Sequence, residues 1–127
     1  MGDELTLQSR LGERWEHIYR VVQLPRFDAE YDICNWFAGT HPLSPYLNNM
    51  IAALPGPNGT RLTLFNARFN VRHPSGAVER RTLESPGEFR SVLRDQFRIA
   101  LSENDLETAL ANVERRGTRG PPHPFVA

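Results

Sequence analysis

The chain has little cysteine and no histidine or cysteine pattern typical of metal ligands. These two features argue against a disulfide-stabilised protein and against a metal-binding protein. Cys34 is the only cysteine among 127 residues, so no disulfide can form within the chain. A single thiol is consistent with a reducing compartment, and we therefore expect a cytoplasmic location. The four histidines are scattered and do not have the spacing typical of metal ligands, so no metal site is predicted.

Excess charge and long apolar runs are also missing. The chain has 15 basic and 15 acidic residues, and its formal net charge is zero. Nucleic acid and anionic membrane surfaces are therefore not expected as partners. No segment approaches the roughly 18 consecutive apolar residues of a membrane-spanning helix. The length is sufficient for one modest domain with its own hydrophobic core.

Alternating apolar residues and turn signals predict several strands. Residues 5–22 are interpreted as a hairpin or as two strands, because Leu5 and Leu7 are spaced by two and Gly12 marks a turn. Residues 46–54 predict a strand, or a short helix that passes into one. Further strands, separated by short turns, are predicted over residues 61–65, 68–72 and 78–83.

Apolar residues at helical spacing predict three helices. The first has Asp28 as a possible N-cap, carries Ala29, Ile33, Trp36 and Phe37 on one face and ends near Thr40. Two more helices follow. Ser85 caps one of them, and the other starts after a capping-box pattern at residues 102–105. Together the elements predict an α+β fold, an antiparallel β-sheet with flanking helices, and residues 117–127 are predicted to be a flexible tail.

The segment from Asp32 to Tyr46 resembles a segment of arylamine N-acetyltransferases. In that family an Asn-aromatic-aromatic group leads to a Thr- and Pro-containing turn, then to a Ser and an aromatic residue. The residues that keep this pattern here are Asn35, Thr40, Pro42 and Ser44, whereas Tyr46 stands where the family usually has Phe. The strands and helix that follow fit the family's third domain in order. The resemblance implies that residues 1–24 end the barrel-like second domain and that residues 25–116 form the third.

The resemblance also implies a chemistry. Family members transfer acetyl from acetyl-CoA to an aromatic amine or hydrazine through a Cys-His-Asp triad, whose cysteine lies in an Arg-Gly-Gly-x-Cys type motif. This chain contains no such motif, and no catalytic residue is assigned. We therefore expect it to be a C-terminal part of such an enzyme, without the catalytic segment and inactive alone. The alternative is a non-catalytic protein-interaction or CoA-binding module.

The resemblance implies two kinds of binding residue. It places Phe37, Thr40, His41 and Ser44 near CoA, and Tyr46 beside the acceptor amine. Aromatic faces pack against adenine or arylamine rings, and hydroxyls satisfy polar ligand atoms. In the competing interpretation the two aromatic residues are core residues and Thr40 ends a helix.

Other side chains also admit two interpretations. Cys34 is a possible nucleophile, and His41, seven residues later, could share a helical face with it. The helix should end before Pro42, however, and this breaks that geometry. A partly buried structural cysteine is the simpler interpretation, and Trp15 and Trp36 are most simply core residues.

A group of arginines would either contact phosphates or cover the solvated face of the sheet. These are Arg68, Arg72, Arg80 and Arg81. Strand edges left open at residues 4–22 predict self-association.

Overall fold

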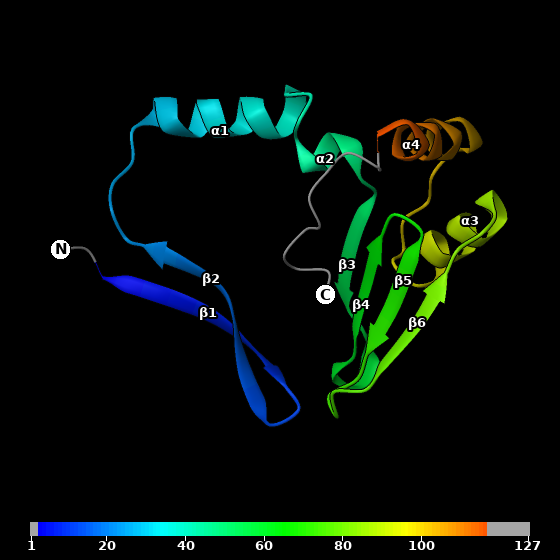
Figure 1. Ribbon diagram of the computed structural model, residues 1–127, viewed down its shortest axis with the longest axis horizontal. Coiled ribbons are helices and arrows are strands. Elements are labelled where there is room, and N and C mark those ends of the chain that lie inside the picture. Colours follow the sequence, from blue (N-terminus) through cyan, green and yellow to red (C-terminus); the bar gives the residue numbers. More distant parts are fainter. Residues whose placement is uncertain (1–2, 117–127) are drawn as a thin grey trace.

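The computed structural model describes residues 3–116, and its elements follow one another with short connections (Figure 1). The predicted tail at residues 117–127 lies outside the described part. The strands are β1 (Glu4–Leu11), β2 (Arg14–Val22), β3 (Ile51–Pro55), β4 (Arg61–Phe65), β5 (Arg68–Arg72) and β6 (Val78–Thr82). The helices are α1 (Asp28–Thr40), α2 (Pro45–Asn48), α3 (Pro86–Asp95) and α4 (Glu103–Arg116), with a 3-10 turn η1 at Pro57–Gly59.

The strands form two separate antiparallel sheets. Within residues 3–116, β1 and β2 pair with each other alone, whereas β3, β4, β5 and β6 form a four-stranded meander in that order. Each connection in the meander is short, as expected for neighbouring antiparallel strands. The predicted α+β fold with an antiparallel sheet and flanking helices is therefore confirmed.

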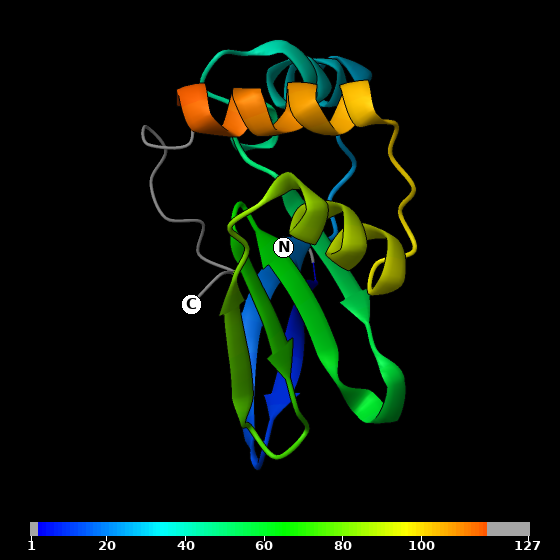
Figure 2. The same cartoon turned by 90° about the vertical axis from the view of Figure 1, so that its right-hand side faces the viewer.

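The hydrophobic core lies between one face of the four-stranded sheet and the helices α3 and α4. Leu62 and Leu64 of β4 and Phe69 of β5 point into it. Phe97 meets the Phe69 ring edge-on, with ring centroids 5.9 Å apart. The remaining core side chains are Leu83, Phe89, Val92, Leu93 and Leu106. Figure 2 shows α3 on this face of the sheet, with α4 crossing above it and the β1–β2 hairpin on the opposite side.

A polar clamp fixes α2 to the sheet. Asn66, in the two-residue turn between β4 and β5, has a left-handed φ of 52°, which asparagine tolerates better than most residues. Its Oδ1 accepts a hydrogen bond from the Met50 backbone N–H at 2.9 Å, and its Nδ2 donates to Asn49 Oδ1 at 2.9 Å. The end of α2 is therefore held against the top of β4.

The first helix differs from its prediction in two respects. Its N-cap is Phe27 rather than Asp28, because the Glu30 carboxylate accepts the Phe27 backbone N–H at 2.9 Å and closes the first turn. The apolar face of the helix is also not covered in the described part of the chain: Ile33 is 65% and Trp36 59% exposed. The expectation that Trp15 and Trp36 are core residues is wrong, since Trp15 on β2 is 62% exposed.

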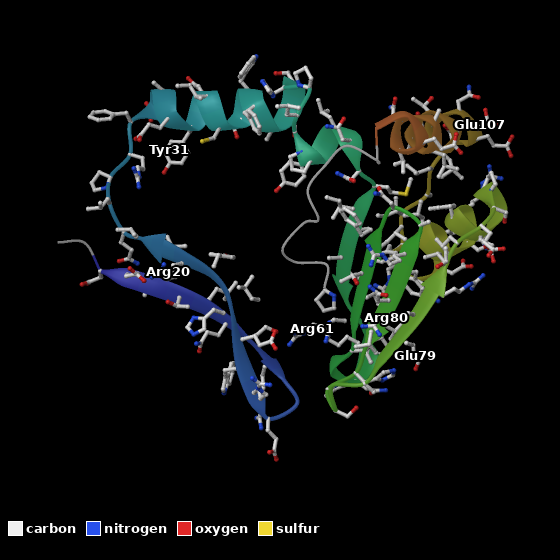
Figure 3. The ribbon with its side chains drawn as sticks, viewed as in Figure 1. Arg20, Tyr31, Arg61, Glu79, Arg80 and Glu107 are labelled. Carbon is white, nitrogen blue, oxygen red and sulfur yellow. The ribbon has the colours of Figure 1, made fainter. Side chains whose placement is uncertain are left out.

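The β1–β2 hairpin contacts the rest of the molecule chiefly near its turn. Arg61, at the start of β4, donates hydrogen bonds to Ser9 Oγ and to the Arg10 carbonyl. Figure 3 shows Arg61 reaching from the sheet toward the hairpin. Gly12, with a φ of 61°, lies so close to the turn after β5 that a Cβ there would sit 3.5 Å from the Ser75 carbonyl oxygen. Among residues 3–116, no helix is long and apolar enough to cross a membrane.

Candidate functional site

The predicted binding residues all lie where α1 ends, turns and enters α2. His41 is the C-cap of α1, with an extended ψ of 132°, and its backbone N–H donates to the Phe37 carbonyl at 3.2 Å. The chain then passes through Pro42 and Leu43 to Ser44, the N-cap of α2. One short segment thus carries all five residues, as the sequence pattern implied.

Ser44 is the structural centre of this segment. Its side chain is fully buried, at 0% exposure, although it is polar. The hydroxyl donates to the Ala38 carbonyl at 2.7 Å and accepts the Tyr46 backbone N–H at 3.3 Å. Because both directions of the hydroxyl are used, Ser44 joins the end of α1 to the start of α2 and does not itself present a polar atom to solvent.

Phe37, His41 and Trp36 form an aromatic cluster beside the turn. The His41 ring stacks on Phe37, with centroids 4.6 Å apart and planes 21° apart. It meets Trp36 edge-on at 5.6 Å. The Leu43 backbone N–H donates to His41 Nδ1 at 3.2 Å, so Nδ1 is the acceptor in this contact. Stacking fixes the imidazole, while Phe37 keeps 41% of its surface exposed.

Thr40 and Tyr46 occupy opposite ends of the turn. The Thr40 hydroxyl donates to the Trp36 carbonyl at 2.6 Å, as a threonine in the last turn of a helix commonly does. Tyr46, the second residue of α2, is 64% exposed. Phe37 and Tyr46, which precede and follow the buried Ser44 in the chain, therefore both present aromatic surface to solvent. A flat ring or an acyl chain could pack against such exposed aromatic faces.

Asn48 also belongs to this segment, although the sequence pattern did not single it out. Its Nδ2 donates to the Pro42 carbonyl at 2.8 Å and to the Ser44 carbonyl at 2.9 Å. Its Oδ1 is buried and has no hydrogen-bond partner among the described residues. A side-chain amide at the end of a four-residue helix gives little sequence signal, so only the folded turn shows that it fastens the loop.

Cys34 does not have the surroundings of an activated thiol. It lies on α1 and is exposed, so the expectation of a partly buried cysteine is wrong. His41 lies after the helix end, where its ring is engaged with Phe37 and Leu43. Among residues 3–116, no hydrogen bond to the Cys34 thiol is present, and no group of three His, Cys, Asp or Glu side chains could hold a metal.

The comparison with known families supports the resemblance. The family model described as N-acetyltransferase matches residues 1–106 of the chain. This chain belongs to that family. The match includes the β1–β2 hairpin, the α1–α2 turn, the whole four-stranded sheet and α3, so it covers most of the described structure.

Individual relatives are similar over only part of their own length. The chain is 26% identical over 102 residues to an arylamine N-acetyltransferase of Escherichia coli, covering 80% of this chain and 36% of that protein. It is 25% identical over 121 residues to the arylamine N-acetyltransferase of Mycolicibacterium smegmatis, covering 88% and 41%. The chain therefore spans about two fifths of the length of these relatives.

Solved structures agree in fold. An arylamine N-acetyltransferase of Mycobacterium marinum, in complex with CoA, superposes with a TM-score of 0.71 at 24% identity, covering 91% of this chain and 42% of that one. The enzyme of Nocardia farcinica gives a TM-score of 0.73 at 23% identity, covering 90% and 40%. The resemblance to arylamine N-acetyltransferases that the sequence predicted is confirmed.

Proposed function

We propose that this chain forms one wall of the CoA and acceptor cleft of an acetyl-CoA-dependent arylamine N-acetyltransferase. The observation that carries the proposal is the α1–α2 turn, where the buried Ser44 holds the exposed aromatic rings of Phe37 and Tyr46 in place. Phe37, His41 and Thr40 face CoA in this proposal, and Tyr46 faces the aromatic amine or hydrazine. Ser44 acts by shaping the turn.

The reacting thiolate in this proposal comes from residues that the 127-residue chain does not contain. The sequence has no Arg-Gly-Gly-x-Cys type segment, and its single thiol, Cys34, is exposed and not paired with a base in the described structure. A cysteine needs a neighbouring base or a lowered pKa to become a nucleophile. The chain alone should therefore give no turnover with acetyl-CoA and an arylamine. Acetylation that is lost on Cys34→Ala would contradict this.

Binding can be tested without turnover. CoA titrated into the purified chain should bind saturably, and Phe37→Ala should weaken that binding, since it removes an aromatic face on the CoA side of the turn. Tyr46→Ala should leave CoA binding unchanged and weaken binding of the arylamine, because Tyr46 faces the acceptor in this proposal. Phe27→Ala is a matched control, because Phe27 is 82% exposed and lies before the other end of α1. If Phe37→Ala and Phe27→Ala bind CoA equally well, the turn is not the CoA-binding surface.

A second candidate function rests on a different observation, the exposed apolar side chains of the hairpin. Leu5, Leu7, Tyr19 and Val21 are all about half exposed, and among the described strands none pairs with either outer edge of the two-stranded sheet. Open strand edges recruit further strands. We infer a protein-interaction module that pairs through these edges, either with itself or with another chain.

The oligomeric state of the purified chain tests this second function. Light scattering should show a dimer at high concentration, and Leu7→Lys should shift it toward monomer by placing a charge on the hairpin. A chain that stays monomeric at every concentration and captures no partner would contradict the module.

A further inference from the structure

The loop between β3 and β4 holds an asparagine that differs from the others in the chain. Asn58 lies at the tip of this loop, in the 3-10 turn η1, and it is exposed. It is the only asparagine that is followed directly by glycine. Asparagine is among the thermolabile residues of proteins, because its side-chain amide can react with the backbone nitrogen of the next residue.

Hydrogen bonds hold the asparagine amides of the α1–α2 turn and of the sheet. Each of these amides donates from its Nδ2 to a neighbouring oxygen; the residues are Asn48, Asn49, Asn66 and Asn70. The Asn58 side chain, in contrast, makes no hydrogen bond within the described residues 3–116. Its amide carbon, Cγ, is therefore not held away from the backbone by a partner.

The backbone at the tip of the loop both permits and delays such a reaction. Gly59 has no Cβ, so no side chain of its own hinders the approach of its nitrogen to Asn58 Cγ. Asn58 has a left-handed φ of 55° and a ψ of 31°. A ring between the two residues closes only when the Gly59 nitrogen and the Asn58 Cβ lie on the same side of the Cα–C bond. A ψ of 31° places them on nearly opposite sides, so the turn must open first.

Thr60 is the residue that keeps this turn closed. Its backbone N–H donates to the Pro57 carbonyl at 3.1 Å, and its carbonyl accepts the Gly56 N–H at 2.9 Å. Its hydroxyl donates to the same Pro57 carbonyl at 2.7 Å. Exposed turns of this kind open locally at a small cost in free energy. The turn should therefore slow the reaction without preventing it.

We propose that Asn58 deamidates spontaneously, at a rate set by the opening of the turn at residues 56–60. The Gly59 nitrogen loses its proton to hydroxide and forms a bond to Asn58 Cγ. The bond from Cγ to Nδ2 breaks, and Nδ2 leaves as ammonia with a proton from water. Water then opens the succinimide ring at either carbonyl, which gives aspartate or isoaspartate. The whole reaction consumes a water molecule, releases ammonia and requires no oxidant or reductant.

The modified turn lies next to the point where the sheet holds the β1–β2 hairpin. Isoaspartate routes the main chain through its side-chain carbons and lengthens the loop, so the start of β4 should shift. Arg61, the first residue of β4, donates hydrogen bonds to Ser9 Oγ and to the Arg10 carbonyl. Deamidation should accordingly loosen the hairpin from the sheet.

Incubation of the full chain at mildly alkaline pH, followed by tandem mass spectrometry, tests the site. Asn58 should convert to aspartate and isoaspartate, whereas Asn104, which is exposed but lies within α4, should stay intact. Thr60→Val should speed the conversion by about fivefold, because the loss of one hydrogen bond favours the open turn. Thr82→Val is the matched control, since Thr82 is exposed and lies on β6. Circular dichroism checks that each variant is folded.

The outcomes concern the turn alone, since none of these measurements uses CoA and the proposed function stands or falls separately. Conversion of Asn58 that is faster in Thr60→Val and unchanged in Thr82→Val supports the proposal. An Asn58 that stays intact in the folded chain overturns it, as does equal conversion of Asn58 and Asn104 or an equal rate in both threonine variants. Amide exchange across residues 4–22 tests the link to the hairpin. Exchange that is faster in the incubated parent chain than in incubated Asn58→Gln supports that link, and equal exchange overturns it.

Discussion

At the scale of single residues, burial in this chain does not follow side-chain size or polarity. Ser44 is completely buried, whereas Trp15 and Trp36 are more than half exposed. A small hydroxyl is stable in the interior when both its donor and its acceptor are satisfied, as those of Ser44 are. The sequence predicted the opposite for the tryptophans, because burial depends on which elements pack together and not on the residue alone.

Removing the Ser44 hydroxyl should therefore destabilise the fold. Ser44→Ala leaves the Ala38 carbonyl and the Tyr46 N–H without their partner, and we expect a loss of about 1–3 kcal/mol in the free energy of unfolding. Urea unfolding measures this. Ser91→Ala, at an exposed position of α3, should change stability by less than about 0.5 kcal/mol. A similar, small effect for both variants would show that the buried hydroxyl does not stabilise the turn.

At the scale of elements, the sequence predicted most boundaries to within a residue or two. The strands predicted at residues 61–65 and 68–72 are observed with those limits, and the helix predicted after Ser85 begins at Pro86. Such boundaries are encoded locally, by capping side chains, by proline at the first helical position and by turn residues. The exposure of α1 could not be predicted in this way, because its apolar spacing is the same whether or not another element covers it.

Glu88, in the first turn of α3, should make the stability of the fold depend on pH. The pKa of Glu88 is lowered, first by the hydrogen bond from the Glu84 backbone N–H and then by Arg81, whose guanidinium lies 2.6 Å from Glu88 Oε1. A carboxyl whose pKa is lower in the folded state stabilises the fold above the ordinary glutamate pKa of about 4.3. That stabilisation is lost as the pH falls through the lower, folded value.

Glu88→Gln should accordingly unfold more easily than the parent chain at neutral pH, and the difference should shrink in acid. Thermal melts at about pH 7 and about pH 3 measure the two differences in Tm. Glu107→Gln on α4 is the control, because that side chain is exposed and lies on another helix (Figure 3). A difference in Tm between the parent chain and Glu88→Gln that is larger in acid than at neutral pH would contradict the lowered pKa of Glu88 as the source of this stabilisation.

At the scale of the whole molecule, residues that are far apart in the sequence come together, and the sequence alone does not show this. Arg10, Arg61 and Arg72 meet at one pocket although β1 and β4 are some fifty residues apart, as the Arg61 contacts with separations of 51 and 52 residues show. The sequence allowed Arg72 either a phosphate-binding or a surface role and did not single out Arg10 or Arg61. The register of β4 against β5 and the position of the hairpin bring the three together.

Arg61 joins the hairpin to the four-stranded sheet through two hydrogen bonds. An isolated two-stranded hairpin is marginally stable in water, so contacts with the rest of the molecule should hold β1 and β2 in place. Arg61→Gln removes the hydrogen bonds to Ser9 and to the Arg10 carbonyl. We expect amide hydrogen exchange to accelerate across residues 4–22 while β4 and β5 keep their protection, because opening of the hairpin would be local.

Arg68→Gln separates this effect from a general loss of positive charge. Arg68 pairs with Phe65 at the other end of the same two strands, away from the hairpin turn. Its substitution should leave exchange in the hairpin unchanged. Equal acceleration in both variants would mean that the charge of the sheet face, and not the Arg61 tie, holds the hairpin. An unchanged hairpin in Arg61→Gln would mean that packing near Gly12 and Ser75 is sufficient.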